Sequence, residues 1–170
     1  MAEIYVISDT HINHSNIIKY CNRPFKNSKE MDEFMIEKWN SVVKPQDKVY
    51  HLGDVYMGSD RRYISSVLHS LNGHKRLIVG NHDNVKQPEL FNNFEKINMW
   101  RMFPEFGLLL THVPVHKSTL RRNPLAEDAY DLLNIHGHIH QNPSPEGPYQ
   151  CVCVEQINYT PVNIEELRIR

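Results

Sequence analysis

Residues 4–11, IYVISDTH, decide how the rest of the chain is interpreted. The run of β-branched and aromatic residues predicts a buried strand, and Asp9 and His11 follow it directly. Four further strand-like runs, VYHL, RLIV, LLLT and LLNI, lead into potential ligands in the same way: Gly53-Asp54, Gly80-Asn81-His82-Asp83, His112 and His136-Gly137-His138-Ile139-His140. Because open α/β sheets place their sites at the carboxyl ends of strands, we expect these side chains to converge over one crevice.

Helical patterns separate the strand-like runs. One helix is expected over residues 28–43, with Ser28 as its N-cap, and a second from the cap Ser59-Asp60 to about residue 71. Strands are expected over 3–8, 48–52, 75–79, 96–103, 108–111, 132–135 and 149–155. The last of them is expected to be a sheet edge or a hairpin arm. Loops are expected over 14–25 and 141–148, and a weak helix over 126–131. The alternation predicts a single α/β layered domain over residues 1–170.

Composition argues against several classes of protein. The 170 residues carry 19 basic and 20 acidic side chains, and a net charge of -1 makes long duplex nucleic acid an unlikely partner. No apolar run reaches the roughly 18 residues of a membrane span, and no signal peptide is expected from the N-terminal residues. Cys151 and Cys153 are interpreted as small packing residues, and three cysteines that cannot all pair favour a reducing, cytoplasmic location.

The residues that follow the five strands form a set of oxygen and imidazole ligands without a thiolate. They are Asp9, His11, Asp54, Asn81, His112, His138 and His140. Such ligands suit Mn²⁺, which we expect here, or Fe, Ni, Co or Zn. Seven ligands with a shared carboxylate fit two ions about 3.5–4 Å apart. Two divalent ions, two carboxylates and a bridging hydroxide leave a charge of roughly +1, which suits an anionic ester.

The motifs stand in a familiar order along the chain. They are Asp9-x-His11, Gly53-Asp54, Gly80-Asn81-His82-Asp83, His112 and Gly137-His138-x-His140. This order resembles the signature of the calcineurin-like metallophosphoesterases, and the segment after the first motif resembles small bacterial and phage members. The resemblance implies a four-layer α-β-β-α sandwich, in which two mixed sheets are flanked by helices.

The resemblance also implies a role for each matching residue. One ion would be held by Asp9, His11 and His140, and the other by Asn81, His112 and His138, with Asp54 bridging the two. A metal-activated hydroxide would attack phosphorus. His82 would act as the general acid that protonates the leaving group, with Asp83 orienting the His82 ring.

Other residues beside the motifs have open interpretations. Three loop residues are candidate substrate contacts, with ordinary structural or surface roles as the alternative: His14, Arg23 and His116. The histidines expected to be structural or exposed are His51, His69 and His74, and His136 is interpreted as either a support for the ligands or a core residue.

The sequence therefore predicts an enzyme that hydrolyses small or nucleotide-like phosphodiesters. A phosphomonoesterase or phosphoprotein phosphatase of the same family is the first alternative. A non-catalytic metal-binding scaffold is the second, and the presence of His82 argues against it. The partner expected is a small phosphate ester, and the oligomeric state is left open.

Overall fold

Strand β1 (Ile4–Ile7) lies between two hydrophobic layers, and its successive side chains pack alternately into one layer and the other. In this computed structural model, which describes residues 1–121 and 130–168, Val6 packs into the core between two sheets and Ile7 packs against helices. Successive residues of a strand point to opposite faces, so one strand contributes to both layers. Burial on both faces explains why the strand is almost continuously apolar in sequence.

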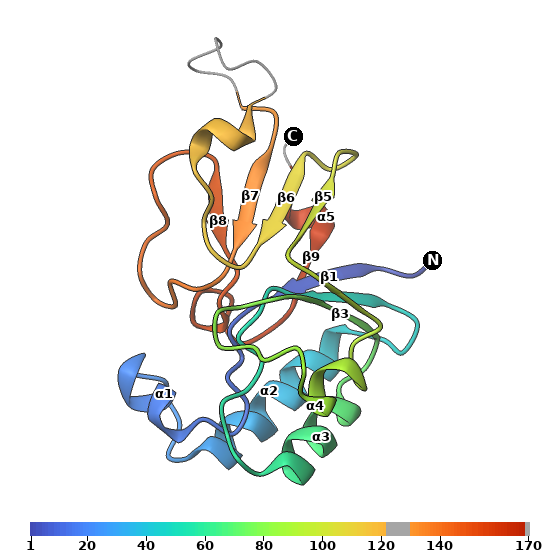
Figure 1. Cartoon of the computed structure of the whole chain (residues 1–170), viewed down its shortest axis with the longest axis vertical. Helices are drawn as coiled ribbons and strands as arrows, with labels where there is room; N and C mark the ends of the chain where they lie inside the picture. The colour runs from blue at the N-terminus through green and yellow to red at the C-terminus, as the bar shows by residue number, and fades with distance from the viewer. Residues whose placement is uncertain (122–129, 169–170) are drawn as a thin grey trace.

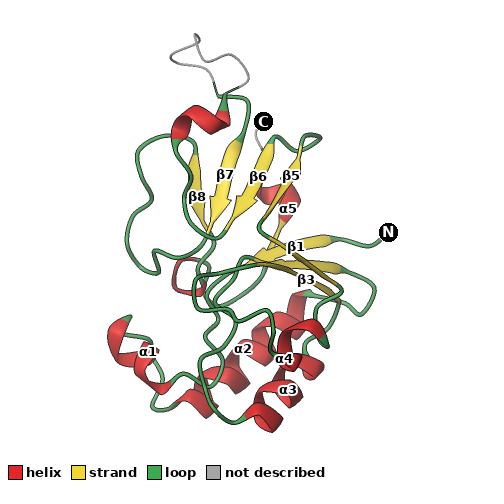
Figure 2. Ribbon diagram, viewed as in Figure 1, coloured by secondary structure: helices red, strands yellow, loops and turns green. Residues whose placement is uncertain are grey.

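The strands form two mixed sheets (Figure 2). The first has the order β4-β3-β2-β1-β9, with β2 (Lys48–His51), β3 (His74–Ile78) and β4 (Lys96–Asn98) parallel to β1, and β9 (Val162–Asn163) antiparallel to it. The second sheet has the order β5-β6-β7-β8. Strand β5 (Trp100–Phe103) runs antiparallel to β6 (Leu108–Thr111). Strands β7 (Leu133–His136) and β8 (Tyr149–Cys151) run parallel to β6.

Helices cover the face of the first sheet that is turned away from the second sheet (Figure 1). They are α2 (Ser28–Val42), α3 (Arg61–Ser70) and α4 (Pro88–Phe91). Trp39 of α2 and Ile64 and Leu68 of α3 are buried in the core beneath that sheet. The outer side of the second sheet carries the short 3-10 helix η1 (Lys117–Leu120), whose Leu120 packs on Leu109. The predicted sandwich of two mixed sheets with flanking helices is confirmed.

Several predicted boundaries are corrected by the structure. Residues 96–103 are not one strand: β4 and β5 belong to different sheets, and Met99 lies between them where the chain crosses over. The N-cap of α2 is Asn27 and not Ser28, because the Asn27 side chain accepts the backbone N–H of Glu30. The predicted loop over 14–25 contains helix α1 (Ser15–Tyr20).

The C-terminal part of the chain differs most from expectation. Strand β8 is an edge strand parallel to β7 rather than a hairpin arm, and the 3-10 helix η2 (Val154–Gln156) follows it. Strand β9 and helix α5 (Ile164–Leu167) were not predicted, and α5 buries Ile164 and Leu167 beside the core between the sheets. The helix expected over 126–131 lies mostly outside the described residues. Within the part of the chain that the structure describes, no helix is both long and apolar enough to cross a membrane.

Candidate metal centre

The predicted convergence of strand ends is present in the structure. Strands β1, β2 and β3 run parallel, so the loops that leave them emerge at one edge, and β6 and β7 do the same in the second sheet. A bridge between Ser8 and Cys153 joins the two sheets at this edge. Two groups of possible ligands therefore meet there, with their nitrogen and oxygen atoms within 4.8 Å of one another inside each group.

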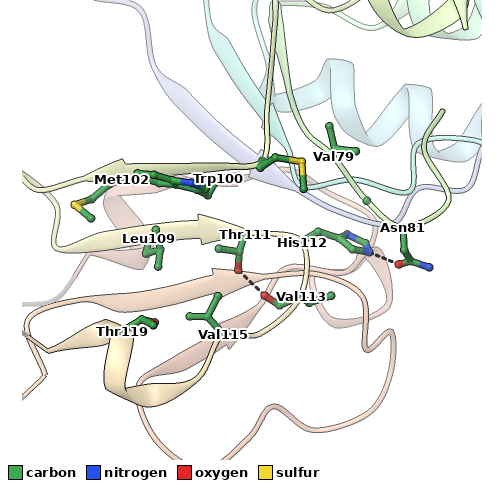
Figure 3. A pocket seen from close by; sticks show the side chains of 12 residues that line it. Val79, Asn81, Trp100, Met102, Leu109, Thr111, His112, Val113, Val115 and Thr119 are labelled. Atoms are coloured by element: carbon green, nitrogen blue, oxygen red, sulfur yellow. Dashed lines mark hydrogen bonds between the residues drawn. The ribbon is translucent and has the colours of Figure 1, made fainter. Parts of the chain in front are cut away.

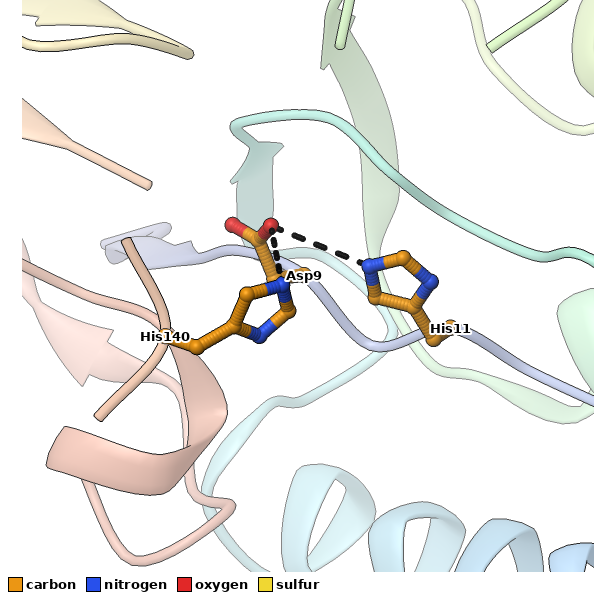
Figure 4. Close-up of side chains that lie close together, drawn as sticks. All are labelled: Asp9, His11 and His140. Carbon is orange, nitrogen blue, oxygen red and sulfur yellow. Dashed lines mark ion pairs between the residues drawn. The ribbon is translucent and has the colours of Figure 1, made fainter. Parts of the chain in front are cut away.

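The first group consists of Asp9, His11 and His140 (Figure 4). Oδ1 of Asp9 lies 3.9 Å from Nε2 of His11 and 3.7 Å from Nε2 of His140. Both Asp9 Oδ1 and His11 Nε2 are buried, and neither has a hydrogen-bond partner. Buried polar atoms are rarely left unsatisfied, so an oxygen and a nitrogen that face each other in this way fit a shared cation.

The second group consists of Asp54, His112 and His138, and Asn81 joins it. The Asn81 Oδ1 atom lies 2.8 Å from Nε2 of His112 and 2.9 Å from Nδ1 of His138. Oδ2 of Asp54 lies 3.5 Å from Nε2 of His112 and 3.7 Å from Nε2 of His11. Asp54 thus lies between the two groups, which is the position that a bridging ligand needs. All seven predicted ligands are brought together.

The backbone around these ligands is strained. Five of them adopt the left-handed region, with φ of 58° at Asp9, 50° at His11, 55° at Asp54, 72° at His138 and 51° at His140. Such conformations cost about 1–3 kcal/mol each in a non-glycine residue and cluster at functional sites. Two of the motif glycines are needed for close approach: Gly53 has a φ of 100°, and a side chain at Gly137 would collide with Ser8 and Asp9.

The electrostatics of the site favour a cation. Burial lowers the pKa of His11 to about 2, so the imidazole is neutral, as a ligand must be. Burial opposes the charge of Asp54, but its hydrogen bond and charge interaction with His112 lower the pKa of Asp54 to about 2. Burial raises the pKa of Asp9 above its ordinary value. A divalent ion would compensate the cost of a buried carboxylate charge at this position.

A buried ion pair, missed in the sequence, supports the first group. Oε1 of Glu155 accepts hydrogen bonds from Nδ1 of His140 at 3.0 Å and from Nε of Arg23 at 2.9 Å, and it forms an ion pair with Nη2 of Arg23 at 2.7 Å. The Arg23 guanidinium also donates to the backbone carbonyls of Asp9 and Thr10. Of the two interpretations left open for Arg23, the structure favours the structural one over substrate contact, because the side chain is buried and holds the loop of the first motif.

His82 and Asp83 take different roles in the loop after β3. His82 is exposed, its ring centroid lies 5.9 Å from that of His11, and its backbone N–H donates to Oδ1 of Asp54 at 2.9 Å. The Asp83 carboxylate accepts the backbone N–H groups of Gly80, Asp54 and Val55. Asp83 therefore fixes two ligand loops, and no hydrogen bond in the described part of the chain joins it to the His82 ring. The orienting role expected for Asp83 stays a prediction.

The remaining candidate contacts differ in their surroundings. Nδ1 of His14 lies 3.1 Å from Nδ1 of His11, and both rings line a pocket that also includes His82 and His140. His116 caps η1 by accepting the backbone N–H of Ser118. No contact among the described residues joins His116 to the candidate ligands, so its substrate role stays a prediction.

Three of the residues interpreted as structural, His51, His136 and Cys153, are buried beside the candidate ligands. His51 is buried between the Thr10 hydroxyl and the backbone N–H of Gly53. His136 is buried and lies 2.9 Å from the carbonyl of Gly137, which makes it a support for the loop that carries two ligands. Cys153 is buried as predicted, and its Sγ donates to Oδ2 of Asp9 at 3.3 Å. His69 and His74 are exposed.

Comparison with known proteins now decides the family. Residues 2–155 match the calcineurin-like phosphoesterase superfamily domain. The chain belongs to this superfamily. Membership makes the protein a metal-dependent phosphoesterase in the general sense, a hydrolase of phosphate esters from a family that binds two divalent ions.

Relatives of this phosphoesterase come from archaea, phages and bacteria. The uncharacterized protein MJ1445 of Methanocaldococcus jannaschii is 40% identical over 173 residues, with 97% of this chain and 89% of that protein covered. The gene 66 protein of Mycobacterium phage D29 is 34% identical over 137 residues, with 79% and 62% covered. The crystal structure of AQ665 from Aquifex aeolicus, a protein of unknown function, shares 30% identity and a TM-score of 0.73, with 98% of both chains covered.

Proposed function

We propose that this phosphoesterase hydrolyses phosphodiesters with small or nucleotide-like groups, using two divalent ions and His82 as the general acid. The observation that carries the proposal is the position of Asp54, between the His11 ring of one group and the His112 ring of the other. Bound at these groups, two divalent ions supply an activated hydroxide and neutralise the charge of the phosphoryl oxygens. Among the ions that the ligands suit, we propose Mn²⁺, and we propose the cytoplasm as the location of the protein.

The roles of the protein residues follow from their positions. Hydrolysis replaces the P–O bond to the leaving group by a P–O bond to hydroxide, and the leaving oxygen needs a proton. The exposed His82 ring lies 5.9 Å from the His11 ring of the first group, which supports a role as the donor of that proton. The product keeps its second substituent and leaves as a monoester.

Two separate pockets favour a diester over a monoester. A pocket of about 510 Å³ is lined by ligands of the first group together with His82 and His14. A second pocket of about 630 Å³ is lined by Asn81 and His112 of the second group. A phosphorus atom held between the groups would have room for one organic substituent on each side, whereas a monoester would fill only one.

The experiment that tests the proposal is a substrate panel with the metal-reconstituted enzyme. The panel compares bis(p-nitrophenyl) phosphate, p-nitrophenyl phosphate, 2′,3′- and 3′,5′-cyclic nucleotides and short oligonucleotides by kcat/KM. We expect a preference for the diester over the monoester of about tenfold or more, a difference of about 1.4 kcal/mol in activation free energy. Preference for the monoester would assign the protein to the phosphomonoesterases, and hydrolysis of none of the esters would favour a scaffold.

A further inference from the structure

The outer face of the second sheet is apolar beside the candidate metal centre. In the antiparallel register of β5 and β6, Trp100 pairs with Thr111 and Met102 pairs with Leu109. Alternate residues share a face, so these four side chains form one surface (Figure 3). Leu109 is nearly buried, whereas 58% of Trp100 and 37% of Met102 are exposed. Contiguous exposed apolar surfaces of this kind often mark binding sites.

This surface is one wall of the pocket of about 630 Å³, which we call the Trp100 pocket. Val79 and Met99 also line it on the side of β3 and β5, and Val113 and Val115 line it from the segment after β6. Its volume falls in the range of small-molecule sites, about 300–1,000 Å³. Because Asn81 and His112 belong both to this pocket and to the second ligand group, a molecule in the pocket reaches the candidate metal centre.

The chemistry of the lining indicates what it binds. None of the described residues that line the pocket carries a carboxylate, an ammonium or a guanidinium group. Its two hydroxyl groups already donate within the protein, Thr111 Oγ1 to the carbonyl of Val113 and Thr119 Oγ1 to the carbonyl of His116. The Asn81 amide and the Trp100 indole N–H remain as donors, so recognition would depend mainly on apolar contact and on stacking against the Trp100 ring.

We propose that the Trp100 pocket binds the flat, apolar substituent that stays on phosphorus when a phosphodiester is hydrolysed, such as an aryl group or a nucleobase. This inference rests on the proposed function. His82 lines the other pocket, so the group that receives the proton lies there and the retained group lies on the side of Asn81 and His112. Because the described lining is largely apolar and offers few hydrogen-bonding groups, it predicts low selectivity among flat groups of similar size.

Two diesters with the same leaving group test the pocket. Bis(p-nitrophenyl) phosphate retains an aryl group and methyl p-nitrophenyl phosphate retains a methyl group. In Trp100→Ala we expect kcat/KM for the bis-aryl ester to fall about tenfold or more, since stacking on an aromatic side chain typically contributes this much. The methyl ester should change less than about twofold, because a methyl group cannot stack.

Two further variants and a binding measurement distinguish a specific loss of the pocket from a general loss of structure or activity. Trp100→Phe keeps a flat ring and should restore most of the preference for the bis-aryl ester. Phe91→Ala removes another exposed aromatic ring, on α4 outside this pocket, and should alter neither ester. Calorimetry with diphenylphosphinate, whose P–C bonds are not hydrolysed, should show about tenfold weaker binding to Trp100→Ala, with dimethylphosphinate binding unchanged.

The possible failures are distinguishable. If the wild-type enzyme hydrolyses both esters and Trp100→Ala lowers both equally or neither, the proposed pocket is wrong and the phosphodiesterase stands. If the wild type hydrolyses neither ester, the proposed function is wrong, and the phosphinate titration still tests the pocket. If Trp100→Ala changes a dimer to a monomer in light scattering without changing the preference between esters, the surface is an interface between copies and the proposal is overturned.

Discussion

At the scale of single residues, the two carboxyl oxygens of Asp9 make different kinds of contact, and the same is true of Asp54. Oδ2 of Asp9 accepts the Ser8 hydroxyl at 2.5 Å and the backbone N–H of His138 at 2.8 Å, while Oδ1 faces imidazoles. Oδ1 of Asp54 accepts the backbone N–H of His82, while Oδ2 faces His11 and His112. One oxygen of each carboxylate thus fixes its orientation and leaves the other for a cation.

The role of His82 predicts an effect that depends on the leaving group. In His82→Asn, hydrolysis of a short oligonucleotide, which releases a poor alkoxide leaving group, should slow about 10²–10⁴-fold. Hydrolysis of bis(p-nitrophenyl) phosphate should slow far less, because p-nitrophenolate leaves without a proton. Metal content measured by plasma mass spectrometry should equal that of the wild type. Wild-type rates on both substrates would remove His82 from the mechanism.

Glu155 is expected to act on metal affinity through His140. Its hydrogen bond to Nδ1 of His140 directs the opposite ring nitrogen toward Asp9. Partners of this kind typically change metal affinity about 10–100-fold, so Glu155→Gln should weaken Mn²⁺ binding by about that factor in a chelator competition titration. Glu146→Gln, a substitution at an exposed position, is the control. Equal affinities in the two variants would contradict this role for Glu155.

Asp32 predicts a pH dependence of stability. It is fully buried in α2, and burial raises the pKa of its carboxyl from 3.8 to about 7, against the opposing hydrogen bond from the backbone of Asn13 and the charge of Arg23. Between these two pKa values the folded state holds a proton that the unfolded chain releases, so the free energy of unfolding falls as the pH rises through this range.

Urea unfolding of the metal-free protein at pH 5 and pH 8 measures this effect. Compared with Asp32→Asn, the wild type should lose on the order of a few kcal/mol of stability between the two pH values. Glu105→Gln, at an exposed turn position, should leave the wild-type dependence unchanged. Identical pH dependence in the wild type and Asp32→Asn would show that the Asp32 carboxyl ionises in the folded protein as it does in the unfolded chain.

At the scale of elements, strand ends were predictable and element boundaries were less so. The apolar runs before Asp9, Asp54 and His112 are buried strands because each contributes to a core, and burial leaves a clear pattern in sequence. The change of sheet between β4 and β5 leaves no such pattern, since both strands are short and most of their residues are exposed. Sequence periodicity reports burial, not the sheet to which a strand belongs.

The cap of α2 gives a direct test at this scale. Asn27→Ala removes the side-chain acceptor of the Glu30 N–H and should cost about 1 kcal/mol in the free energy of unfolding. Ser28→Ala alters the first helical residue, whose side chain does not cap the helix, and should cost much less. Urea denaturation of both variants is the measurement. A larger loss in Ser28→Ala would restore Ser28 as the cap.

At the scale of the whole molecule, the sequence identified the seven candidate ligands but not the network behind them. The ligands belong to short motifs, each next to its strand, so their positions follow from local pattern and sheet geometry. The ion pair of Arg23 and Glu155 joins residues 132 positions apart, and only the folded chain brings them together. For the same reason, the sequence leaves Arg23 open between a substrate contact and a structural role, because an isolated arginine in sequence does not indicate a buried partner.

The central claim is that two divalent ions held by the two ligand groups are required for hydrolysis of a phosphodiester. The direct measurement is a titration of Mn²⁺ into chelator-treated protein, at a protein concentration well above the dissociation constant, with the rate of bis(p-nitrophenyl) phosphate hydrolysis recorded at each addition. We predict no hydrolysis without metal and a rate that levels off at about two equivalents of metal. Full activity without metal, or a plateau at one equivalent, would contradict the claim.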